Sequence, residues 1–110
     1  MASRIAFFKD NTVNINLAFT DVDLSGATVY FTVKVFEDSS EDDSTALIKK
    51  DITSHTDPTA GLTTITLTPS ETNKTPKLYK YDIKLKKANG DKQTVAKGKC
   101  EIKQVITNRG

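Results

Sequence analysis

The segment Ala27-Thr-Val-Tyr-Phe-Thr-Val-Lys-Val-Phe36 decides the fold, because its apolar and polar residues alternate with a period of two. In an extended chain, Phe31 and Val33 point to one side, whereas Thr32 and Lys34 point to the other. This pattern is typical of a half-buried β-strand, with one face in a core and the other toward solvent or a partner. We therefore predict a strand over 27–36, and the other segments are expected to supply its partners.

Six further segments have strand character and are separated by turn residues. They lie at 3–8, 12–19, 45–52, 62–67, 78–87 and 92–107, and Thr68-Pro-Ser-Glu71 predicts one helical turn. Asn89-Gly90 predicts a tight two-residue type I′ hairpin turn. Along 92–107 the apolar residues change from odd-numbered to even-numbered positions, which predicts a bulge near Gly98. Seven strands at this spacing predict an all-β sandwich.

The core residues are predicted from the apolar residues that occupy alternate positions along these strands. The set is Val13, Ile15, Leu17, Val29, Phe31, Val33, Ile65, Leu67, Tyr81, Ile83, Cys100 and Ile102. The length of 110 residues fits a single domain over 1–110. No run approaches the ~18 consecutive apolar residues of a membrane span, and the first residues lack the apolar region of a signal peptide. With one cysteine and no such segment, we expect a protein of a reducing compartment, or of an assembly built in one, without membrane contact.

Charge is distributed unevenly, although the net charge is only +2. Residues 1–73 contain 5 Lys and Arg against 11 Asp and Glu, a charge of −6, whereas residues 74–110 contain 11 against 3, a charge of +8. The acidic part includes a loop at 37–44 that we expect to be solvated and mobile. The basic part places lysines on the outward parity of the last two strands, namely Lys80, Lys84, Lys86, Lys97, Lys99 and Lys103. Such a division is typical of an oriented partner contact, of a nucleic-acid surface, or of solvation alone.

No pattern typical of catalysis, metal binding or a cofactor is present. His55 is the only histidine and Cys100 the only cysteine, which does not predict a zinc site or an activated nucleophile. His55 is predicted to be a plain surface residue. The acidic loop lacks the glycine and the closing glutamate of an EF-hand, and the isolated glycines do not form a phosphate-binding loop. We therefore expect a protein that is not an enzyme and has no catalytic residues, cofactor or metal.

Three stretches are distinctive in combination. They are Asp23-Leu-Ser-Gly-Ala-Thr-Val-Tyr-Phe-Thr-Val-Lys34, then Pro58-Thr-Ala-Gly-Leu-Thr-Thr-Ile-Thr-Leu-Thr-Pro-Ser-Glu-Thr72, then Tyr79-Lys-Tyr-Asp-Ile-Lys-Leu85 followed by Asn89-Gly-Asp91 and Gly98-Lys-Cys-Glu-Ile102. Together they resemble the immunoglobulin-like domains of tailed bacteriophage structural proteins. The most similar family is the amino-terminal domain of phage baseplate upper proteins.

This resemblance implies an immunoglobulin-like antiparallel β-sandwich of about seven strands. It implies a non-enzymatic module that attaches to other virion structural proteins of the tail, baseplate or capsid, either as an adaptor or as a capsid decoration. Multiple copies in a symmetric assembly are expected, located in the virion after synthesis in the host cytoplasm. The alternative is a free module that binds carbohydrate or nucleic acid through the basic hairpin face. Nucleic acid is the less favoured ligand, because Asp82 and Glu101 interrupt the lysines.

The surface that contacts a partner is predicted from charge and from apolar residues near both ends of the chain. Exposed charges are screened beyond ~8 Å at physiological salt, so they are expected to set approach and register. Affinity is expected to come from unpaired β segments and apolar side chains. The predicted interface residues are Ile5, Phe7, Phe8, Asp42, Asp43, Lys84, Lys86, Lys97, Lys99, Val105 and Ile106.

Overall fold

The computed structural model describes residues 2–107 and 109, and this part of the chain forms seven strands. The predicted all-β fold is thereby confirmed. The strands are β1 (Ala2–Phe8), β2 (Val13–Ala18), β3 (Thr28–Val35), β4 (Ile48–Ile52), β5 (Leu62–Leu67), β6 (Lys77–Lys86) and β7 (Lys92–Lys103). Three short helical segments lie between strands: η1 (Asp43–Thr45), η2 (Pro58–Ala60) and α1 (Pro69–Thr72).

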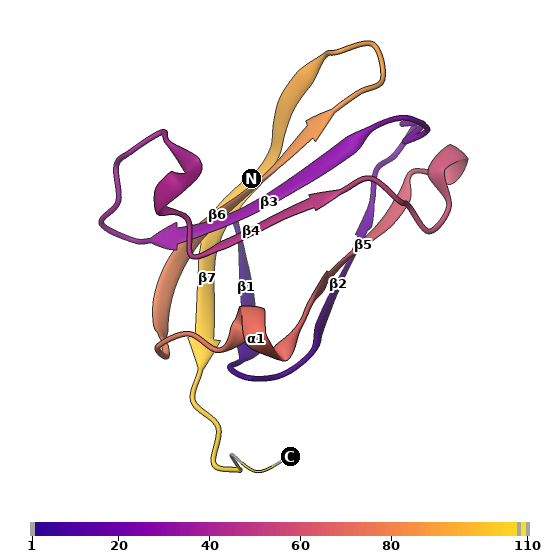
Figure 1. The fold of residues 1–110 in the computed structure, drawn as a ribbon. Helices are drawn as coiled ribbons and strands as arrows, with labels where there is room; N and C mark the ends of the chain where they lie inside the picture. The colour runs from indigo at the N-terminus through magenta and orange to yellow at the C-terminus, as the bar shows by residue number, and fades with distance from the viewer. Residues whose placement is uncertain (1, 108, 110) are drawn as a thin grey trace.

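The strands form two sheets that enclose one core (Figure 1). The larger sheet has the order β1-β7-β6-β3-β4, and the smaller sheet consists of β2 and β5. β1 runs parallel to β7, whereas every other pair of neighbouring strands in the described part is antiparallel. The predicted antiparallel arrangement is therefore wrong for this one pair. The strand predicted at 27–36 is β3, which lies between β6 and β4 inside the larger sheet.

β3 occupies the centre of the core. Phe31 is fully buried, and its ring centroid lies 5.9 Å from that of Tyr81 on β6. Of the predicted core residues, the buried ones are Val29, Phe31, Val33, Ile65, Leu67, Tyr81, Ile83, Cys100 and Ile102. The prediction is less accurate for β2, since Val13, Ile15 and Leu17 pack against the core but stay partly exposed. β2 has a single neighbour in its sheet, so one of its edges is open.

The helical turn predicted after β5 is confirmed as α1, which begins with a capping box. The Thr68 hydroxyl accepts a hydrogen bond from the Glu71 N–H at 3.3 Å, and the Glu71 carboxylate accepts one from the Thr68 N–H at 2.9 Å. The buried Thr72 hydroxyl then donates to the Asn11 carbonyl at 2.7 Å and accepts from the Asn11 N–H at 3.0 Å. These hydrogen bonds connect the turn between β1 and β2 to the segment between β5 and β6.

The β6–β7 hairpin differs from the predicted two-residue turn. A backbone hydrogen bond of 2.8 Å joins the Lys87 N–H to the Asp91 carbonyl, so residues 88–90 form a three-residue loop. Gly90 has a φ of +95°, but Asn89 is not among the residues with positive φ. Since a type I′ turn needs positive φ at both central positions, that turn type is wrong. The Asn89 carboxamide oxygen instead accepts a hydrogen bond from the Asp91 N–H at 2.9 Å.

The irregularity predicted in β7 exists, but it lies nearer the hairpin. Ile83 pairs with Ala96 and Lys84 pairs with Thr94, so Val95 is the extra residue of the bulge. Gly98 was the expected position, and it pairs regularly with Tyr81.

Two strands are shorter than predicted by three residues or more. β4 begins at Ile48 rather than at 45, because the Asp42 carboxylate accepts a 2.9 Å hydrogen bond from the Ser44 N–H and caps η1 there. β7 ends at Lys103 rather than near 107. Its last pairing is with Phe8, so no neighbouring strand continues past that point.

Candidate functional site

The outer face of the larger sheet, which points away from β2 and β5, carries a row of four cationic residues. Lys34 on β3 pairs with Lys80 on β6, Lys80 pairs with Lys99 on β7, and Lys99 pairs with Arg4 on β1. Like charges directly opposite each other on neighbouring strands are destabilising. The row therefore requires anionic or carbonyl groups close to it.

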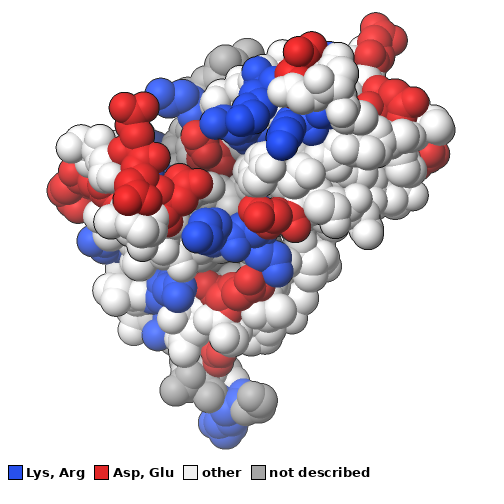
Figure 2. Space-filling view, turned by 45° about the horizontal axis from the view of Figure 1, so that its top comes forward, with Lys and Arg blue, Asp and Glu red and all other residues white. Residues whose placement is uncertain are grey.

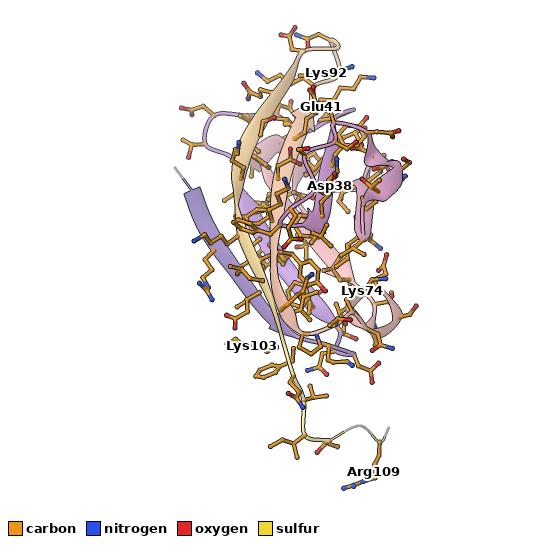
Figure 3. The ribbon with its side chains drawn as sticks, turned by 90° about the vertical axis from the view of Figure 1, so that its left-hand side faces the viewer. Asp38, Glu41, Lys74, Lys92, Lys103 and Arg109 are labelled. Atoms are coloured by element: carbon orange, nitrogen blue, oxygen red, sulfur yellow. The ribbon has the colours of Figure 1, made fainter. Side chains whose placement is uncertain are left out.

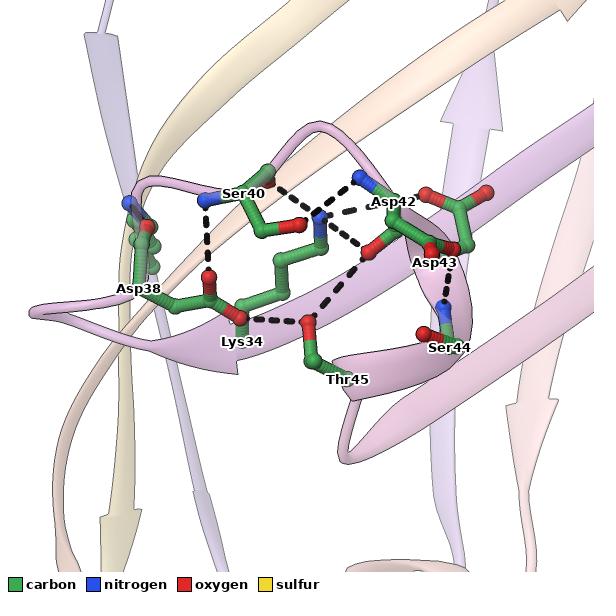
Figure 4. A network of polar contacts seen from close by, with 8 residues as sticks. Lys34, Asp38, Ser40, Asp42, Asp43, Ser44 and Thr45 are labelled. Atoms are coloured by element: carbon green, nitrogen blue, oxygen red, sulfur yellow. Dashed lines mark hydrogen bonds and ion pairs between the residues drawn. The ribbon is translucent and has the colours of Figure 1, made fainter.

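The acidic loop, residues 37–44, supplies such groups from within the chain (Figure 4). The Lys34 ammonium donates to the Ser40 carbonyl at 2.8 Å and to the Asp42 carbonyl at 3.1 Å, and lies 3.9 Å from the Asp43 carboxylate. The Lys80 ammonium donates to the carbonyl of Asp38. The loop that was predicted to be solvated and mobile is largely exposed, and it is hydrogen-bonded to the lysines of its own sheet.

The loop is also bonded within itself. The Asp38 carboxylate accepts hydrogen bonds from the Thr45 hydroxyl at 2.5 Å and the Ser40 N–H at 2.8 Å, and these bonds lower the pKa of Asp38 below its usual range. The bond from the Ser44 N–H likewise lowers the pKa of the Asp42 carboxyl. Both carboxylates are therefore used to shape the loop, although the sequence marks them only as part of an acidic run.

An open groove of about 880 Å³ lies between this loop and the outer face. Figure 3 looks onto this side of the molecule, where Asp38 and Glu41 lie in front of the strands. The exposed ring of Phe36, which is 45% accessible, lines the groove beside the loop. Its charged lining residues are Arg4, Lys34, Glu41, Asp43, Lys80, Asp82, Lys84, Lys97 and Lys99.

The charged side chains around the groove differ in how they are paired. Arg4 forms an ion pair with Glu101 at 2.5 Å, and Lys34 and Lys80 are held by the loop. Within residues 2–107 and 109, three groove lysines make no side-chain hydrogen bond or ion pair: Lys84, Lys97 and Lys99. The same holds for the carboxylates of Glu37 and Glu41 in the described structure. The outer face thus carries unpaired groups of both signs.

The structure brings together part of the predicted interface. Asp43, Lys84, Lys97 and Lys99 line the groove, and Asp42 lies in the loop that forms one of its walls. Lys86 lies farther along β6, where it pairs with Lys92 beside the hairpin loop. The acidic loop contacts Lys34 and Lys80 of this face, and neither of these lysines is among the predicted interface residues.

The predicted apolar contacts are separated from the groove. Phe7 is buried and Ile5 is partly buried against the core, so the expectation that this segment is unpaired is wrong. Phe8 is 48% accessible, with the Lys103 ammonium 5.5 Å from its ring centroid. Beyond β7 the chain leaves the sandwich (Figure 1), with Val105 partly buried and Ile106 fully exposed.

The interface prediction missed several groove residues, among them Arg4, Lys34, Phe36, Glu41, Lys80 and Asp82. The outward parity of Lys34 was visible in the sequence. Its alignment with Lys80 and Lys99 depends on strand order and register, which no short-range pattern encodes. Arg4 joins the row only because β1 pairs in parallel with β7.

His55 differs from its prediction as a plain surface residue. It is partly buried, with Nε2 2.9 Å from the Ala27 carbonyl and Nδ1 2.9 Å from the buried Thr63 hydroxyl. A carbonyl can only accept, so Nε2 donates to Ala27, and in the neutral ring Nδ1 accepts from Thr63. His55 therefore joins the segment before β3 to β5, and its role is structural.

Among the described residues, no three His, Cys, Asp or Glu side chains are grouped so that they could hold a metal ion. None of the helices in that part is long and apolar enough to span a bilayer. Compared with models of known protein families and with curated proteins, the chain matches none of them.

Proposed function

We propose that the chain is a non-enzymatic structural module of a tailed bacteriophage virion, which attaches to other virion proteins through surface contacts. The single observation that carries the proposal is the outer face, where a groove is bordered by unpaired lysines on the sheet and by the unpaired carboxylate of Glu41 on a folded loop. Docking of this kind needs complementary surfaces rather than reactive groups. A tail, baseplate or capsid position is compatible with it.

The arrangement of strands supports the immunoglobulin-like part of the proposal. In variable-type immunoglobulin domains, the strands named G, F, C and C′ share one sheet while B and E lie in the other. Counting along this chain, β7-β6-β3-β4 lies in the larger sheet and β2-β5 in the smaller one, and β1 joins the larger sheet beside β7. The motifs that resemble phage modules fall on β3, on the stretch from η2 to α1, and on the β6–β7 hairpin.

The geometry also favours docking with a fixed register. Lys34 and Lys80 hold the acidic loop at several points, so its charges keep a defined position relative to the sheet. Charges placed in this way steer a partner and exclude wrong orientations. A stable contact buries ~800 Å² of surface on each partner, which is more than the groove alone offers. Such a contact would also include apolar groups such as the exposed Phe36 ring.

Incorporation into assembled particles tests the proposal. Purified particles should contain the protein, and gentle dissociation should place it with heads or with tails. A variant with Lys84, Lys97 and Lys99 changed to glutamine should be incorporated several-fold less well. Lys74→Gln/Lys103→Gln is the control, because both lysines lie outside the groove, and it should be incorporated normally. Absence of the native protein from particles would overturn the proposal.

A free polyanion-binding module is the second candidate, because the unpaired groove lysines and the exposed Phe36 could contact phosphates and a base. The acids Glu41, Asp43 and Asp82 line the same groove and weaken that case. A mobility-shift titration with single-stranded DNA and RNA at two salt concentrations separates the candidates. Micromolar binding that weakens steeply with added salt would favour the polyanion-binding function.

A further inference from the structure

Two sets of unpaired charges lie side by side on the same surface. Glu37 and Glu41 belong to the acidic loop, and the facing lysines of the groove include Lys97 and Lys99 on β7. In the space-filling view, the acidic side chains gather over the loop at the left (Figure 2). In the described structure, neither set has a side-chain partner, although Glu41 lines the same groove as Lys97 and Lys99.

Adjacent patches of opposite charge have a geometric property that patches on opposite sides of a molecule do not have. A second copy rotated by 180° about an axis between the patches places its acidic loop on the lysines of the first copy. The same rotation places the lysines of the second copy under the loop of the first. Such an isologous contact uses each patch once and closes after two molecules.

We propose that two copies of this chain pair through their outer faces in this two-fold manner. Phe36 lines the same groove as Glu41 and the β7 lysines, and in this pairing the two Phe36 rings lie close to the axis and lose solvent exposure together. Aromatic groups near the centre of an interface, surrounded by polar groups, contribute most of the affinity in many complexes. The partner of the outer face is then a second copy of the chain.

A second copy fits better than an unrelated acidic partner because the chain itself carries both halves of the contact. The loop also provides a precedent, since its carbonyls and Asp43 already cover Lys34 and Lys80 of the same face. The intermolecular contact extends this arrangement to Lys97 and Lys99. This inference deepens the proposed function, because it names one neighbour on the particle, but its test uses only purified protein.

Exposed ion pairs are individually weak, so the association is expected at high protein concentration and should weaken with added salt. Sedimentation equilibrium at low ionic strength measures it. Two charge-reversed variants change only unpaired side chains: Glu37→Lys/Glu41→Lys and Lys97→Glu/Lys99→Glu. In each variant alone, like charges meet at both symmetry-related contacts, and the dissociation constant should rise at least tenfold. An equimolar mixture restores opposite charges at both contacts and should form a heterodimer.

Lys74→Glu/Lys103→Glu is the matched control. It has the same net charge as the Lys97/Lys99 variant, but its lysines lie outside the groove, and Figure 3 shows them below the loop. Mixed with the Glu37/Glu41 variant, it should give no heterodimer. Circular dichroism confirms that each variant is folded.

Three results would overturn the inference. They are a wild-type protein that stays monomeric at millimolar concentration in low salt, a complementary mixture that does not associate, and growth beyond dimers. The last would indicate a head-to-tail contact instead. Particles that contain the protein while the purified chain stays monomeric would leave the proposed function standing and remove only the pairing.

Discussion

Replacing Phe31 with alanine tests whether β3 faces the core as the alternation indicates. The Phe31 side chain has no accessible surface, and its ring contacts that of Tyr81 with centroids 5.9 Å apart. Truncation of a buried phenylalanine costs ~3 to 5 kcal/mol, out of the ~5 to 15 kcal/mol that stabilise a small domain. Each kcal/mol lowers the Tm of a domain of this size by ~4 °C or more, so a fall of at least ~12 °C is expected.

Thermal unfolding followed by far-ultraviolet circular dichroism measures this effect, since the chain contains no tryptophan. Phe36→Ala is the matched control, because the same side chain is 45% accessible just beyond the end of β3. It should change stability by less than ~1 kcal/mol. Equal loss in both variants, or an unchanged Tm in Phe31→Ala, would refute the orientation assigned to β3.

The remaining predictions concern a glycine, a carboxyl and a thiol. Gly61→Ala should destabilise the fold far more than Gly90→Ala in urea unfolding, because both have positive φ but only a Cβ at Gly61 would lie 2.2 Å from a backbone oxygen. The pKa of Asp38 should lie below 3.8 by NMR titration, because the Thr45 hydroxyl donates a hydrogen bond to the carboxylate. The stability that this bond adds is present above pH 3.8 and is lost only as pH falls through the lowered pKa. Thr45→Ala should therefore raise the pKa of Asp38. Burial raises the pKa of Cys100 to about 12, so a thiol reagent at pH 9 should react only with unfolded protein. The contribution of this thiol to stability should decline as pH rises from about 9 toward 12. Labelling of the folded chain at the rate of a free thiol would contradict the burial of Cys100.

Local alternation predicted the strands because side-chain direction in a strand depends only on the neighbouring residues. β5 has the predicted bounds at both ends, and the alternating residues of β6 are buried on the expected side. The capping box of α1 was also predictable, since Thr68 and Glu71 act within one turn of helix. In these elements the pattern and its cause lie within a few residues, so the predictions were accurate.

Contacts between distant segments could not be predicted in this way. The hairpin residues Asn89-Gly90 allow more than one turn, and the register of β6 against β7 selected the three-residue loop. The parallel pairing of β1 depends on its position beside β7 at the edge of the sheet. The groove depends on both the strand order and the return of the acidic loop over Lys34 and Lys80, which explains why only some of its charged residues were predicted and why their proximity was not.

Lysine modification of intact particles tests the central claim most directly, because it reports both the location of the protein and the surface that it uses. An amine-reactive reagent is applied to purified particles and to the free protein at low concentration, and labelling is read at each lysine by mass spectrometry. We predict that Lys84, Lys97 and Lys99 are labelled several-fold more slowly in particles, whereas Lys74 and Lys103 react similarly in both. Absence of the protein from particles, or equal labelling of the groove lysines in both states, would contradict the account.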